Sequence, residues 1–255
     1  FYVSLSACDA LQAKVCLSLK DYTNAAAYAD KVITKSNFAL STTSVEYAQA
    51  FVSNSSSKEL VFALANKRST SLLLFYQTVN DIDPTWDYSP STECYSHLYD
   101  DTAVKSKDIR AKAVFGADNS RIIKFPNGST GQFVTNEQPS QTPIVVTRVA
   151  EMYLIKAEAL GAVNGLATLK EFMNKRYATV LLPSNMTDIE FQNQILDERH
   201  RELYAEGQRW YDLKRTNRLD LFSSLNGRNY LMYYPVPQSE RDLAGEENYP
   251  QNEGY

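Results

Sequence analysis

From Val3 to Leu19 the chain carries apolar side chains at intervals of three and four, the spacing of one face of an amphipathic helix. A second stretch, residues 24–36, repeats the pattern with small residues that let two helices approach closely, and a turn at residues 20–22 separates the two. The pattern predicts an antiparallel helical hairpin over residues 1–37. The expected apolar face of its first helix consists of Val3, Ala7, Cys8, Leu11, Val15, Cys16 and Leu19.

The turn and the second helix of this hairpin resemble a tetratricopeptide repeat. The resemblance places Tyr22 at the turn and Ala25 and Ala29 at the crossing of the two helices. A helical hairpin of another kind remains the alternative.

The middle of the chain has a different pattern of apolar and turn residues. Residues 59–64 form a short apolar run that predicts a buried strand. Residues 66–147 are punctuated by proline and by turn residues, and only residues 121–125 and 144–146 are strand-like. So long an irregular stretch is usually functional or disordered, and its aromatic residues favour order.

Helical periodicity returns in the last third of the chain. A helix is expected from about Thr147, with Gly161 as its stop, and residues 167–177 can return against it. Thr187 and Glu190 have the spacing of a capping box, which predicts a helix ending at residues 206–207. Residues 210–215 predict a further short helix, and the prolines of residues 234–237 predict an extended segment.

Composition narrows the class of protein. The 255 residues include 26 Lys and Arg against 30 Asp and Glu, a net charge of −4, which argues against a nucleic-acid-binding protein. With 44% hydrophobic and 12% aromatic residues the chain is expected to fold, and no stretch approaches the roughly 20 apolar residues of a membrane span. Its three cysteines, Cys8, Cys16 and Cys94, lack metal-binding spacing and are expected in the core.

The motifs of the last third resemble the closing signature of the SusD/RagB family, the outer-membrane nutrient-binding lipoproteins of Bacteroidetes. Two upstream blocks are also similar to that family, in the same order. The matching residues are Glu198-Arg199-x-x-Glu202-Leu203-x-x-Glu206-Gly207-x-Arg209-Trp210-x-Asp212-Leu213-x-Arg215, Tyr234-Pro235-Val236-Pro237-x-x-Glu240, Gln251-Asn252-x-Gly254-Tyr255, Arg148-x-Ala150-Glu151-x-Tyr153-Leu154-Ile155 with Asn174-x-Arg176, and Pro90-Ser91 with Asp108-x-Arg110.

This resemblance implies a mainly α fold, a tetratricopeptide-like α-α superhelix with a long loop-rich insertion and a few short strands. It implies one SusD-like domain over residues 1–255 that is incomplete at its N-terminus, because family members are about twice as long. Its parts would be the hairpin at 1–37, a loop-rich ligand region at 66–147 and a C-terminal helical region at 148–255. Glu253 replaces the proline usual in the family's tail motif.

Candidate ligand-binding residues follow from the chemistry of sugars, whose apolar ring faces pack on aromatic side chains while amides bind the hydroxyl groups. The loop-rich region offers Trp86 and Tyr88, with Tyr76, Gln77 and Asn80 just upstream. The alternative is that Trp86 fills a gap between the loop and the helices. The other tryptophan, Trp210, is expected to be structural.

An enzyme is not expected. The best-patterned carboxylates, Glu151, Glu158, Glu202 and Glu206, are expected to pair with Arg148, Arg176 and Arg199, which would lower their pKa rather than raise one for an acid catalyst. His97 and His200 lack a second ligand cluster, so a metal site is not expected and both are assigned to a solvated helix face. No phosphate loop or nucleophile motif is present, and no cofactor is predicted.

The sequence thus predicts a non-catalytic surface protein that binds oligosaccharide or polysaccharide. The resemblance implies delivery of the ligand to a SusC-like TonB-dependent transporter, in the outer membrane, with membrane attachment only through a lipid anchor upstream of residue 1. Two alternatives stay open: a peptide-binding RagB-like receptor, and a helical protein-interaction adaptor without glycan binding.

Overall fold

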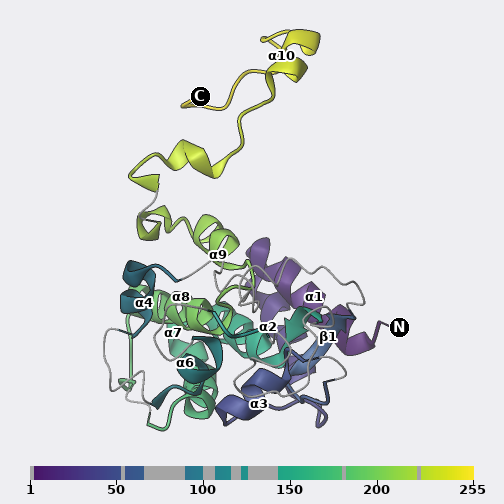
Figure 1. Ribbon diagram of the computed structural model, residues 1–255, viewed down its shortest axis with the longest axis vertical. Coiled ribbons are helices and arrows are strands. Elements are labelled where there is room, and N and C mark those ends of the chain that lie inside the picture. Colours follow the sequence, from purple (N-terminus) through teal and green to yellow (C-terminus); the bar gives the residue numbers. More distant parts are fainter. Residues whose placement is uncertain are drawn as a thin grey trace, which may run out of the picture. The chain divides into compact units, whose positions relative to one another are not determined.

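The computed structural model describes residues 3–52, 55–65, 90–99, 107–115, 122–125, 143–179, 182–222 and 225–255. These residues are mainly helical, as the sequence predicts, with two short strands (Figure 1). The chain forms two compact units, Phe1–Glu206 and Gly207–Tyr255. Each unit is described by itself.

The predicted N-terminal hairpin is confirmed as α1 (Leu5–Ser18) and α2 (Tyr22–Ile33). Ser4 and Asp21 cap the two helices, each accepting a hydrogen bond from the backbone three residues on. Buried alanines, among them Ala10 and Ala25, let these helices pack closely on each other and on the first part of α7.

The face of α1 that packs inward differs from the predicted one. Its buried residues are Ala7, Ala10, Ala13 and Leu17, whereas the larger Leu5, Val15 and Leu19 are 71%, 56% and 74% exposed. The helix is apolar on two opposite sides. The alanine side packs inward because its small side chains allow α2 and α7 to come close. Cys8 is therefore exposed rather than a core residue, Cys16 is half-buried, and Tyr22 is exposed at the start of α2.

Two of the three strand-like segments predicted in the middle region are strands, whereas residues 122–125 form only an isolated bridge between Ile122 and Phe115. The strand β1 (Leu60–Leu64) pairs antiparallel with β2 (Ile144–Arg148), with Leu60 opposite Arg148 and Leu64 opposite Ile144. Three short helices were not predicted: α3 (Ser44–Gln49), α4 (Thr92–Tyr99) and α6 (Ile109–Val114). Aromatic side chains of α3 and α4 and aliphatic side chains of α6 form a core cluster with Phe115 and Phe125, so the described parts of the loop-rich region are packed.

The helix α7 (Val149–Arg176) breaks at Gly161, whose φ of 71° confirms the predicted stop. The capping box also forms: Thr187 accepts from the backbone N–H of Glu190, whose carboxylate accepts from that of Thr187, and α8 (Asp188–Glu202) begins there. This helix ends at Glu202, four residues before the predicted end, because a buried lysine binds its last carbonyl groups.

The second unit holds α9 (Arg209–Arg215), the 3₁₀ turns η4 (Leu219–Leu221) and η6 (Asn229–Met232), and α10 (Gln238–Ala244). Trp210 packs edge-on against Phe222, with ring centroids 5.4 Å apart. The side chain of Gln251 accepts from Val236 N over 2.7 Å and donates to Val236 O over 3.1 Å. These bonds tie the tail to the extended Tyr-Pro-Val-Pro segment.

Candidate functional site

The five candidate ligand residues, Tyr76, Gln77, Asn80, Trp86 and Tyr88, lie outside the described residues. Their role stays a prediction. The structure does describe motif residues of the first unit, among them Arg110, Arg148, Arg176 and Glu202, which come from distant parts of the sequence and meet inside that unit.

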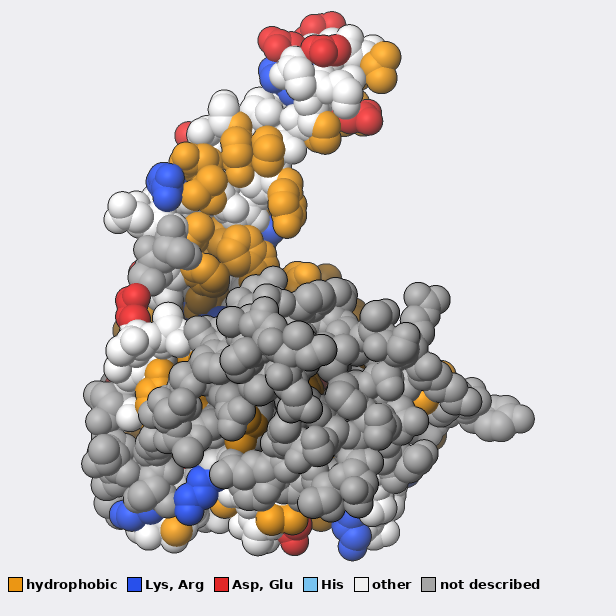
Figure 2. Space-filling model, in the orientation of Figure 1, with side chains coloured by type: hydrophobic (Ala, Val, Ile, Leu, Met, Phe, Trp, Pro, Cys, Tyr) orange, Lys and Arg blue, Asp and Glu red, His pale blue; other side chains and the backbone are white. Residues whose placement is uncertain are grey.

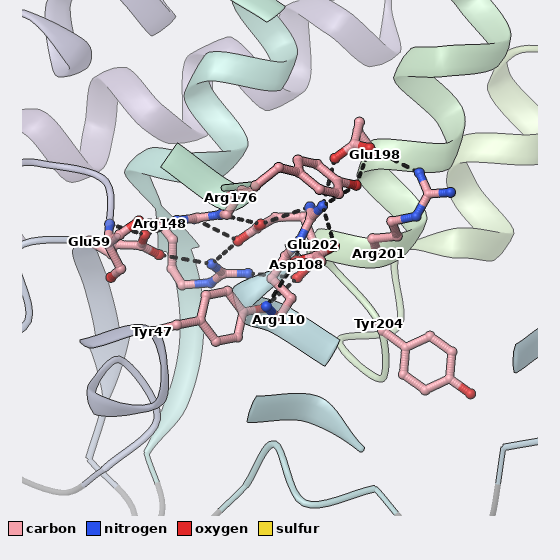
Figure 3. Close-up of polar contacts among 12 residues, drawn as sticks. Tyr47, Glu59, Asp108, Arg110, Arg148, Arg176, Glu198, Arg201, Glu202 and Tyr204 are labelled. Atoms are coloured by element: carbon pink, nitrogen blue, oxygen red, sulfur yellow. Dashed lines mark hydrogen bonds and ion pairs between the residues drawn. The ribbon is translucent and has the colours of Figure 1, made fainter. Parts of the chain in front are cut away.

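The centre of this meeting point is Glu202, the last residue of α8 (Figure 3). Its carboxylate accepts from three guanidinium groups: Arg176 Nε at 2.9 Å, Arg148 Nη1 at 2.5 Å and Arg110 Nη1 at 3.3 Å. These arginines come from the end of α7, the end of β2 and the first turn of α6, and all four side chains are buried. One carboxylate therefore links four separate elements.

Glu59, just before β1, binds the same arginines from the other side. It accepts from Arg176 Nη2 over 2.7 Å and from Arg148 Nη1 over 3.2 Å. Its second role is to accept the backbone N–H of Ser41 over 2.7 Å. Glu59 thus connects the strand pair to the loop that follows α2.

Arg110 is held by two further carboxylates. Asp108, which caps α6, accepts from Arg110 Nη2 over 2.9 Å, and Glu198 of α8 accepts from the same nitrogen over 2.7 Å. The Tyr177 hydroxyl accepts from Arg110 and donates to Glu198, each over 2.7 Å. Arg201 adds a 2.9 Å ion pair to Glu198.

We call this group the arginine–carboxylate cluster. It also includes Lys124 and Glu206, so five cationic and five anionic side chains balance in the interior. The members are Glu59, Asp108, Arg110, Lys124, Arg148, Arg176, Glu198, Arg201, Glu202 and Glu206.

The electrostatics of the cluster keep its glutamates ionised. Burial alone would raise the pKa of Glu202, but the attraction of Arg176, Arg148 and Arg110 outweighs it and lowers that pKa well below its usual range. Arginine neighbours lower the pKa of Glu198 in the same way, against the effect of burial. The expectation that Glu202 pairs with Arg148 and Arg176 is confirmed, and these carboxylates lack the raised pKa of an acid catalyst.

Lys124 ends α8. Its ammonium group donates to the carbonyl oxygens of Glu202 and Tyr204, each over 2.9 Å, and to Glu206 Oε1 over 2.6 Å. The last carbonyl groups of a helix have no partner inside the helix, so a buried cation there is favourable. Burial nevertheless lowers the pKa of Lys124 to about 8, against the opposing attraction of Glu206.

Sequence reasoning missed Lys124 and Glu59 as cluster members. Each sits at or in a short apolar stretch, and a charged residue in such a stretch is a signal of a buried ion pair.

The two histidines were both predicted on a solvated helix face. His200 is instead half-buried, with its ring stacked on Tyr204 and Nε2 at 3.7 Å from Cys94 Sγ. His97 is exposed and contacts Asp197 at 3.1 Å.

A small polar pocket of about 330 Å³ lies in the same unit. Hydroxyl, amide and charged side chains line it, including Thr42, Glu46, Gln49 and Lys58. None of the described residues that line it is aromatic. The pocket can hydrogen-bond a small polar molecule, but it provides no flat face for stacking.

The described part of the chain shows neither a metal site nor a membrane span. It contains no group of three or more His, Cys, Asp or Glu side chains placed to hold a metal ion. None of its helices has both the length and the apolar character needed to cross a membrane.

The helical hairpin of α1 and α2 and the short strand pair define the class first: a mainly helical protein of the tetratricopeptide-like kind. The sequence profile of the SusD family matches residues 106–230. Residues 106–230 of the chain are thus similar to this family.

One curated relative is the starch-binding protein SusD of Bacteroides thetaiotaomicron, 33% identical over 173 residues, which cover 62% of this chain and 30% of the relative. A solved SusD superfamily protein from the same species matches 98% of this chain and 61% of its own length, with a TM-score of 0.72 and 23% identity. Surface glycan-binding protein A of that species, in complex with laminarihexaose, matches 98% of this chain and 64% of its own length, with a TM-score of 0.62 and 18% identity. The chain therefore spans less than two thirds of each of these relatives.

Proposed function

We propose that this chain is part of a non-catalytic cell-surface receptor for oligosaccharides or polysaccharides. The observation that carries the proposal is the 33% identity with a starch-binding protein over 62% of the chain. The shared fold with a protein that binds laminarihexaose is in keeping with it.

The proposed binding residues are those of the loop-rich region. Trp86 and Tyr88 would offer ring faces to the sugar, with Tyr76 beside them, and Gln77 and Asn80 would bind hydroxyl groups. Two stacking contacts and a few hydrogen bonds give a binding free energy of roughly −4 to −6 kcal/mol, or millimolar to tens of micromolar affinity. A repeating polymer compensates for such weak sites through avidity.

We infer binding rather than hydrolysis, and the carboxylates of the cluster support this. A glycosidase needs two carboxyl groups facing one cleft, one of them with a raised pKa. Glu198, Glu202 and Glu206 are instead paired with cations, and each has a lowered pKa. The lowered pKa values of these three glutamates support a receptor that binds its ligand without turnover.

The receptor would act at the outer membrane, beside a SusC-like TonB-dependent transporter that takes up the ligand. Attachment to the membrane would be through a lipid anchor on a segment before residue 1. Pairing of the full-length protein with that transporter, in a pull-down from outer membranes, tests this part independently of ligand binding.

Isothermal titration calorimetry of the chain against laminarin, starch and a peptide panel tests the ligand class. We expect heat with a glycan, a loss of about tenfold in affinity for Trp86→Ala, and a smaller loss for Trp86→Phe, which keeps an aromatic face. The thermal unfolding midpoints of both variants serve as the folding control. Absence of glycan binding, binding of peptides alone, or release of shorter glycans would each overturn the proposal.

A further inference from the structure

The second unit contains a groove of about 650 Å³ formed entirely within residues 207–255. Three segments converge on it: the turn after α9, the turn η6 and the C-terminal tail. Its volume is within the range of roughly 300–1,000 Å³ typical of small-molecule sites. The lining residues are Asn217, Leu219, Asn229, Tyr230, Tyr233, Asn252, Glu253 and Gly254.

The groove is held in shape by contacts of the tail. Gly254 has a φ of 98°, and the ring of Tyr230 lies so near that a Cβ at residue 254 would be 2.5 Å from Tyr230 Cγ. The ring of Tyr255 meets Tyr230 edge-on, with centroids 5.1 Å apart, and its hydroxyl donates to Tyr233 O over 2.7 Å. Asn252 Nδ2 donates to Tyr234 O over 2.7 Å. The groove is therefore pre-organised.

The lining combines two tyrosines with three asparagines. A primary amide both donates and accepts, which matches a hydroxyl group that does the same. A tyrosine ring offers an apolar face and a polar edge, and Tyr233 is 55% exposed. This combination suits a molecule that alternates apolar faces with hydroxyl groups.

The charge of the groove also favours a neutral ligand. Glu253 is the single charged residue of the lining, which disfavours anionic ligands. The nearby Lys214 ammonium lies over the Tyr233 ring at 4.3 Å and donates to Met232 O over 3.3 Å. A purely apolar ligand would leave the amides of the groove without partners, at a cost of about 1–3 kcal/mol each.

We infer that this groove is a second oligosaccharide subsite, which binds neutral sugar units through Tyr233, Asn229 and Asn217. The inference rests on the proposed function for its ligand class but not for its location, because the proposed site is in residues 76–88. Figure 2 shows hydrophobic side chains gathered along the part of the second unit that precedes α10. Two subsites on one receptor would raise its avidity for a long polymer.

The test is calorimetry of the full chain with laminarihexaose and maltohexaose. The two lining variants are Tyr233→Ala and Asn229→Ala, which alter exposed side chains. Tyr234→Ala is the matched control, since Tyr234 is the adjacent residue, is 94% exposed and does not line the groove. Binding at the groove is expected as a second phase of the titration. We expect each lining variant to weaken this phase about tenfold and the control to change it less than about twofold.

Trp86→Ala separates this inference from the proposed function. Loss of one phase in Trp86→Ala and of the other in the lining variants supports both sites. If Trp86→Ala abolishes all binding, or if the lining variants bind as the unaltered chain does, the groove is not a subsite although the receptor stands. If only the lining variants lose affinity, the groove stands and the site at Trp86 fails. An equal loss in Tyr234→Ala, or no glycan binding at all, overturns the inference.

Discussion

Arg176 and Glu202 face each other inside the first unit, with Nε donating to Oε2 over 2.9 Å and both side chains buried. They lie 26 residues apart in the sequence and join the end of α7 to the end of α8. Because Arg148 and Arg110 bind the same carboxylate, one residue holds together the strand pair and three helices. These four signature residues thus serve the fold.

Removing the charge of Glu202 is expected to be severe. Glu202→Gln keeps the shape of the side chain but leaves three buried guanidinium groups with one anion fewer, and breaking a buried pair in this way costs about 3–5 kcal/mol. Urea unfolding followed by circular dichroism measures the loss. Asp188→Asn, an exposed acidic residue on the same helix, is the control and is expected to cost less than about 1 kcal/mol. Equal effects of the two changes would contradict the central role of Glu202.

The pairing of Glu202 with Arg148 and Arg176 could be predicted because all three belong to recognisable motifs. The burial of the cluster could not, since helical spacing alone does not tell a surface ion pair from an interior one. Glu59 escaped prediction because its partner Arg176 is 117 residues away. The ligand residues proposed in the loop-rich region stay predictions.

Helix boundaries are also predicted correctly only where local interactions set them. The capping box marked the start of α8 correctly because a cap is a local interaction. The end of α8 was placed too late because Lys124, 78 residues from Glu202, binds the last carbonyl oxygens. Long-range contacts of this kind are not encoded in local spacing.

Lys124 gives a pH dependence with a definite sign. The folded chain loses this proton at a pKa of about 8, and the unfolded chain at the ordinary value of 10.5. Between these values the unfolded state binds more protons, so the free energy of unfolding rises with pH, by about 2 kcal/mol between pH 7 and pH 9.5. In Lys124→Met this rise is absent.

Urea unfolding of the two proteins at pH 7 and pH 9.5 measures the effect. We expect the stability of the unaltered chain relative to Lys124→Met to increase by about 2 kcal/mol over this interval. A constant difference would mean that Lys124 keeps its proton in the folded chain throughout.

The inward face of α1 can be checked with a pair of substitutions on that helix. Leu17 is buried against α2 and α7, so Leu17→Ala is expected to cost about 2–5 kcal/mol through the cavity that it leaves. Val15→Ala removes a side chain that is largely exposed and is expected to change stability by less than about 0.5 kcal/mol. The reverse order in thermal or urea unfolding would restore the face predicted from the sequence.

The tail motif depends on Gly254, and two alanine substitutions separate its two roles. Gly254 and Gly227 both have positive φ, of 98° and 76°, so either alanine strains the backbone by about 1–2 kcal/mol. A Cβ at residue 227 has no atom within 4 Å, whereas a Cβ at residue 254 collides with the Tyr230 ring. Gly254→Ala is therefore expected to detach the tail, breaking the bond from the Tyr255 hydroxyl to Tyr233 O.

Hydrogen exchange by mass spectrometry measures this detachment. We expect faster exchange in peptides covering residues 230–255 for Gly254→Ala, with little change there for Gly227→Ala and none in α1 or α2 for either variant. Because the tail forms one wall of the groove, Gly254→Ala is also expected to weaken the second glycan-binding phase as Tyr233→Ala does. Slow exchange of the tail in Gly254→Ala would show that the ring of Tyr230 moves aside to accept the added methyl group.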